Sequence, residues 1–70
     1  MSRQIDLNGR HFWILSEPNA GPVWKATVME VTTGGSPQAV GIDATAETRA
    51  AADDAAEREL RRMVDAQRER

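Results

Sequence analysis

The fold begins with the stretch Gln4-Ile5-Asp6-Leu7-Asn8-Gly9-Arg10-His11-Phe12-Trp13-Ile14-Leu15-Ser16. β-Branched and aromatic residues lie on both sides of Asn8-Gly9, which is typical of two strands joined by a turn. Both central positions of a type I′ turn need a positive φ angle, and Asn and Gly tolerate that angle best. The sequence therefore predicts a hairpin that joins a strand at about residues 4–7 to a second strand at about residues 10–16. Its tight turn pairs Leu7 with Arg10 and Ile5 with Phe12.

This register divides the side chains of the hairpin between the two faces of a sheet, because paired residues share a face. The two sets are Ile5, Leu7, Phe12 and Ile14 on one face, and Gln4, Asp6, His11, Trp13 and Leu15 on the other. One helix can cover only one face. The more regular apolar pattern of the first set places it beneath the helix. We therefore expect His11, Trp13 and Leu15 to lie on the face that the helix leaves uncovered.

The composition of the chain changes near Asp43. All five Gly and all three Pro come before it, and the 27 residues after it contain neither. The first part predicts further strands at about residues 23–32 and 38–42. The second part predicts a helix at about residues 45–66, capped by Asp43 or Thr45, with residues 67–70 frayed.

The predicted helix has an apolar stripe that consists of Ala52, Ala56, Leu60 and Met63. Its first half is small, so we expect that end to pack closely against the strands. The predicted fold is α+β: an antiparallel sheet of three or four strands with one C-terminal helix on one face, in the order β-β-β-(β)-α. Residues 1–70 form one small domain.

Composition excludes several kinds of chemistry. The chain has 70 residues, a net charge of -2 and no cysteine, which excludes disulfides and thiolate metal sites. Residues 1–43 and 44–70 each carry a net charge of -1, so no basic block favours binding to nucleic acid. No apolar stretch of the length of a secretion signal or a membrane span is present, and we expect a cytoplasmic location without membrane contact.

The sequence indicates no catalytic, cofactor or metal site, and we expect a protein that is not an enzyme. His11 is the only histidine, and no Ser/His/Asp spacing accompanies it. Asp53 and Asp54 point to different sides of the predicted helix, so they do not converge on a metal ion. The run Gly34-Gly35-Ser36-Pro37 lacks the Lys of a phosphate-binding loop and precedes a strand rather than a helix.

Two functions remain open, and the first is protein binding through the uncovered face. Its predicted residues are His11, Trp13, Leu15 and Lys25, and its partner is a second copy of the chain or another protein. The alternative is binding to nucleic acid, RNA in particular. Its predicted contacts are Arg10, Lys25, Arg58, Arg61 and Arg62.

The segment Val40-Gly41-Ile42-Asp43-Ala44-Thr45 and the Ala-rich helix after it resemble the small sheet-and-helix domain of HicB-like antitoxins. Gly41, Thr45, Glu47 and residues 50–52 carry this likeness, which covers about residues 4–64. The family's Pro-Gly-Cys-like segment is replaced here by residues 34–37, and residues 1–70 contain no stretch similar to the family's C-terminal DNA-binding segment. The strand order is also similar to the β-β-β-α part of double-stranded-RNA-binding domains, without their first helix. Both resemblances concern the fold more than the function. As functions they imply an RNA-binding domain or a HicB-like antitoxin component, which stand as alternatives to protein binding.

Overall fold

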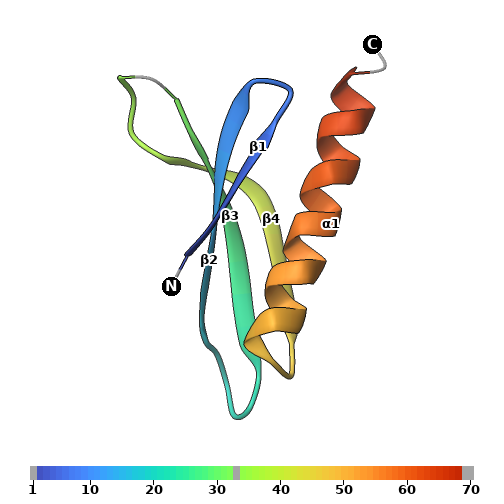
Figure 1. Ribbon diagram of the computed structural model, residues 1–70. Coiled ribbons are helices and arrows are strands. Elements are labelled where there is room, and N and C mark those ends of the chain that lie inside the picture. Colours follow the sequence, from blue (N-terminus) through green and yellow to red (C-terminus); the bar gives the residue numbers. More distant parts are fainter. Residues whose placement is uncertain (1, 33, 69–70) are drawn as a thin grey trace.

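The computed structural model describes residues 2–32 and 34–68 of the protein. Within these residues, four strands form one antiparallel sheet in the order β1-β2-β3-β4, and one helix packs against a single face of it (Figure 1). The elements are β1 (Ser2–Leu7), β2 (Arg10–Pro18), β3 (Trp24–Val31), β4 (Gln38–Ala46) and α1 (Arg49–Arg68). This arrangement confirms the predicted α+β fold, with β4 present as a full strand.

The hairpin of β1 and β2 has the predicted turn and register. Asn8 and Gly9 have φ angles of 52° and 77°, the positive values that a type I′ turn requires. Leu7 is paired with Arg10, and Ile5 with Phe12. Here local turn chemistry alone determines the pairing, because a two-residue loop leaves no freedom to shift the register.

Strand β4 is longer than predicted and is interrupted by an irregularity. Thr27 pairs with Asp43 and Met29 with Ala39, so three residues of β4 lie opposite Val28 alone. Gly41, at the centre of these three, has a φ angle of 82°, which a residue with a side chain rarely adopts. The extra length of β4 is thereby absorbed locally, and Val40 and Ile42, on either side of Gly41, both pack against the core.

The predicted start of the helix is wrong. Asp43 and Thr45 lie in β4, and α1 begins at Arg49. Thr48 is the capping residue: its Oγ1 accepts a hydrogen bond of 3.1 Å from the Ala51 amide, and its carbonyl accepts one of 3.0 Å from the Ala52 amide. The strand continues this far because Ala44 and Ala46 pair with residues of β3. At the other end, residues 67 and 68 are helical rather than frayed, and the expected fraying of 69 and 70 lies outside the described residues.

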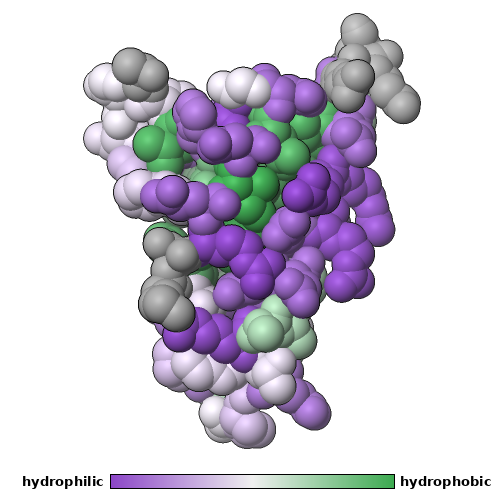
Figure 2. All heavy atoms as spheres, viewed as in Figure 1, coloured by the Kyte–Doolittle hydropathy of each residue, from purple (hydrophilic) through white to green (hydrophobic). Residues whose placement is uncertain are grey.

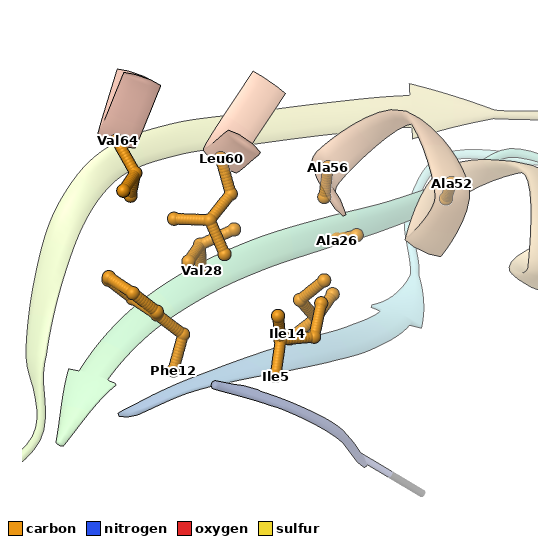
Figure 3. Packing of buried hydrophobic residues seen from close by; sticks show 9 residues of the cluster. All are labelled: Ile5, Phe12, Ile14, Ala26, Val28, Ala52, Ala56, Leu60 and Val64. Carbon is orange, nitrogen blue, oxygen red and sulfur yellow. The ribbon is translucent and has the colours of Figure 1, made fainter. Parts of the chain in front are cut away.

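The core fills the space between the sheet and α1 (Figure 3). Its buried residues are Ile5, Phe12, Ile14, Ala26, Val28, Ala52, Ala56, Leu60 and Val64. The first half of the helix presents small side chains to the sheet, as predicted, since Ala52 and Ala56 are fully buried along with Ala26. The predicted stripe is correct at Ala52, Ala56 and Leu60 but not at its fourth position. Val64 is buried there, whereas the predicted Met63 is half-buried at the margin of the core. This core is thin, because each strand contributes few large side chains to it.

The core is less well covered near the C-terminal half of α1. Figure 2 shows apolar atoms at the surface between the β1–β2 hairpin and this half of the helix, surrounded by hydrophilic side chains. Leu7 and Met63 are among the half-buried side chains that pack against the core. No helix in the described part of the chain has the length and apolar character needed to cross a membrane.

Candidate interaction surface

The face of the sheet opposite α1, here called the uncovered face, is ordered by the strand register. Three cross-strand rows follow from the pairings: Asp6–His11–Val31, Gln4–Trp13–Met29–Ala39 and Glu17–Lys25–Thr45. Between the last two rows, Leu15 is paired with Thr27, and Thr27 with Asp43. Phe12 and Ile14, the residues of β2 on either side of Trp13, are fully buried on the other face, beneath α1. The predicted choice of face is therefore confirmed.

An apolar stripe runs along β2 and β3 at the centre of this face. It consists of Trp13, Leu15, Met29 and Val31. Leu15 is 42% exposed, the highest exposure of any large apolar side chain in the described residues. The other three are half-buried by their neighbours in the sheet. This stripe presents apolar surface that no element of the described chain covers.

Polar groups border the stripe at both ends. At one end, His11 Nδ1 lies 2.7 Å from Asp6 Oδ1, and both side chains are largely exposed. At the other end, Glu17 lies directly across from Lys25. An apolar centre with charged borders is the usual composition of a protein–protein contact, where the borders determine orientation.

A shallow hollow of about 310 Å³ lies at the His11 end of the face. It is lined by Gln4, Asp6, His11, Phe12, Trp13, Val31 and Thr32. The exposed imidazole is oriented by the Asp6 carboxylate.

On the face of the sheet that α1 covers, Arg10 of β2 forms an ion pair with Glu30 of β3 and a hydrogen bond to Gln67 of α1. Arg10 Nε and Nη2 donate to the two carboxylate oxygens of Glu30 at 2.9 and 2.8 Å, and Nη1 donates to Gln67 at 2.7 Å. This two-point contact lowers the pKa of Glu30 and raises that of Arg10. The Arg10 guanidinium also lies 5.1 Å above the Phe12 ring.

A second ion-pair cluster ties the edge strand β1 to the helix. Arg3 donates to Asp54 at 2.9 Å and to Glu57 at 3.0 Å. Glu57 also accepts from Arg61 at 2.9 Å, and the bonds from Arg61 and Arg3 hold the pKa of its carboxyl below the usual range. These contacts stabilise the covered side and leave the uncovered face without comparable charge networks among the described residues.

The residues predicted for nucleic-acid binding do not form one surface. Lys25 lies on the uncovered face, whereas Arg10 lies on the side of α1 and is held by Glu30. Arg61 and Arg62 are on the helix, where each pairs with an acidic neighbour, Glu57 or Glu59. Arg58 and Arg62 line a hollow between α1 and β4, together with the acidic residues Asp43 and Glu59. The basic side chains are thus divided between two sides of the molecule and interspersed with carboxylates.

The sequence prediction named part of the uncovered face and missed the rest. His11, Trp13, Leu15 and Lys25 all lie on it, as predicted. Met29, Val31 and Glu17 were not predicted for the site. Their alternation along the strands was a sufficient signal for the face. Their pairing with β2 depends on the conformation of residues 19–23 between β2 and β3, which the sequence does not define.

The described residues include no group of three or more His, Asp or Glu side chains placed to hold a metal ion. Comparison with protein-family models, with curated proteins and with solved structures gives no significant match. The HicB-like and RNA-binding-domain-like resemblances therefore stay predictions about the fold.

Proposed function

We propose that this protein is a small, non-catalytic interaction module that binds another protein chain through the uncovered face. The observation that supports this proposal is the apolar stripe of Trp13, Leu15, Met29 and Val31 on a sheet face without a covering element. Burying the exposed part of Leu15 alone would contribute about 1 kcal/mol to binding. Contiguous apolar surface with a polar border is typical of protein contact sites.

Nucleic-acid binding has less support. It would need cations gathered on one surface to neutralise successive phosphates. Here Lys25 and the arginines of α1 lie on opposite sides of the sheet, and the arginines alternate with Glu57 and Glu59. We therefore favour a protein partner.

Site-specific photo-crosslinking tests the proposal. A photo-reactive amino acid replaces Leu15 in the full chain, and the matched control carries it in place of Arg58, an exposed residue of α1. We expect irradiation of producing cells to give a discrete crosslinked protein from position 15 and none from position 58. Products from position 58 alone, or from neither position, would show that the uncovered face is not an interaction site.

A further inference from the structure

The cross-strand pairs at the centre of the uncovered face are complementary in size or charge. Along β2 and β3, Trp13 lies across from Met29, Leu15 from Thr27, and Glu17 from Lys25. In each pair a large side chain faces a smaller or more adaptable one, or an acid faces a base. A surface with this property can bind its own copy, because a two-fold symmetric contact requires that residue i meets residue j while j meets i.

We propose that the occupant of the uncovered face is a second copy of this chain, in a face-to-face sandwich whose two-fold axis runs between β2 and β3, parallel to both strands. This inference rests on the proposed function and names its partner. The axis places each residue over the copy of its own cross-strand neighbour. Trp13 then lies against Met29 of the partner subunit, which is a favourable aromatic–sulfur contact. Glu17 lies against Lys25 of the partner subunit, and each such contact occurs twice.

The alternative axis, across the strands, fits less well. It would place Lys25 over Val31 of the partner subunit, so Lys25 would lose its contact with Glu17 of the partner subunit. The axis along the strands keeps that charge contact and places His11, rather than Lys25, over Val31 of the partner subunit. The axis along the strands also keeps the acids of the edge strands apart. Asp6 lies in the row of His11, whereas Asp43 lies in the row of Thr27, so the symmetry does not place one over the other.

The size of the face predicts a reversible dimer. Four strands about 4.8 Å apart, each with about eight residues that rise about 3.3 Å, give about 500 Å² of sheet per copy and about 1,000 Å² for both. This area is at the low end of specific protein interfaces. Sheets in a sandwich pack about 10 Å apart, which leaves room for Trp13 and Met29 to interdigitate. We therefore expect dimers that dissociate on dilution.

Charge reversal at the Glu17–Lys25 contact tests this geometry. The variants Glu17→Lys and Lys25→Glu each place like charges together twice in the dimer, and we expect each to raise the dissociation constant at least about tenfold in sedimentation equilibrium. Mixed in equal amounts, they restore opposite charges at both contacts. We therefore expect the mixture to form a heterodimer with nearly the wild-type dissociation constant. The control Arg62→Glu, on the outer surface of α1, should leave association unchanged.

The folded state of each variant is checked by circular dichroism, since both positions lie at the surface of the sheet. A wild-type chain that stays monomeric at about millimolar concentration overturns the dimer. So does a dimer that the two single variants leave unchanged, or a mixture that shows no recovery. These failures are distinct from failure of the proposed function: a monomer whose position 15 crosslinks to a different protein refutes the dimer and retains the interaction site.

Discussion

Phe12 and Trp13 are adjacent in the chain and have opposite environments. Phe12 is fully buried beneath α1, whereas Trp13 lies on the uncovered face. Successive side chains of a strand point to opposite faces, so two neighbouring aromatic residues cannot both enter a core that has only one side. This residue-level constraint could be predicted from sequence, because it needs only the strand and the count of helices.

The Arg10–Glu30 pair is the ion pair whose removal has the clearest expected effect on stability. Both Glu30 oxygens accept bonds from Arg10, and the two side chains are only 22% and 33% exposed. We expect Glu30→Gln to lower the free energy of unfolding by about 0.5–1 kcal/mol near neutral pH. Chemical denaturation with urea measures this difference.

The pH dependence of that effect has a definite sign. The pKa of Glu30 is lower in the folded state than in the unfolded chain, because Arg10 stabilises the carboxylate. The contribution is therefore complete above the unfolded pKa and disappears as the pH falls through the folded pKa. The difference between wild type and Glu30→Gln should persist at about pH 7 and disappear in acid, once the pH is below the lowered folded pKa of Glu30. A matched control is Glu59→Gln, whose contact with Arg62 is longer, at 3.4 Å, and mostly exposed. Equal losses from both substitutions, or a loss that persists in acid, would contradict this account.

At the scale of elements, a boundary can be predicted when the residues that determine it are close together in the sequence. The hairpin could be predicted with its register, because Asn8-Gly9 determines it locally. The end of β4 could not, because Asp43, Thr45 and Thr48 are all suitable capping residues by type. The choice among them depends on pairing between β4 and β3, which are joined by a loop, and on the irregularity at Gly41. The residue types that favour a helix start reveal neither the β3–β4 pairing nor the irregularity at Gly41.

The cap of α1 provides the second stability prediction. Thr48→Ala removes the hydroxyl that accepts from the Ala51 amide, and we expect a loss of about 1 kcal/mol in unfolding free energy. Thr45→Ala is the control, since Thr45 is an exposed residue of β4 rather than the cap. Its effect should be smaller than that of Thr48→Ala, and Thr48→Ser should retain most of the stability. Denaturation curves in which Thr45→Ala is the more damaging variant would place the start of the helix where the sequence pattern suggested.

For the whole molecule, the main constraint is that one helix and one sheet form a single layer of core. That one face of the sheet stays uncovered could be predicted from the sequence. The hairpin has apolar residues on both of its faces, whereas the sequence predicts one helix, which can cover one face. The full composition of the uncovered face could not, because Met29 and Val31 join Trp13 only through the β2–β3 register. Residues that share a face are predictable from alternation, whereas residues that are neighbours across strands depend on tertiary pairing.

Association through the uncovered face should make thermal stability depend on protein concentration. A folded dimer draws the unfolding equilibrium toward the native state by mass action, so the melting temperature of the wild type should rise by several degrees over about a hundredfold increase in concentration. Leu15→Gln leaves the core intact, because Leu15 is 42% exposed and lies outside the buried cluster. We expect this variant to melt near the wild-type temperature of dilute samples and to show no concentration dependence. Ala51→Gln, on the exposed surface of α1, is the control and should keep the wild-type dependence. Calorimetric scans in which the wild-type melting temperature is the same at every concentration would mean that the stripe of Trp13, Leu15, Met29 and Val31 does not stabilise a dimer.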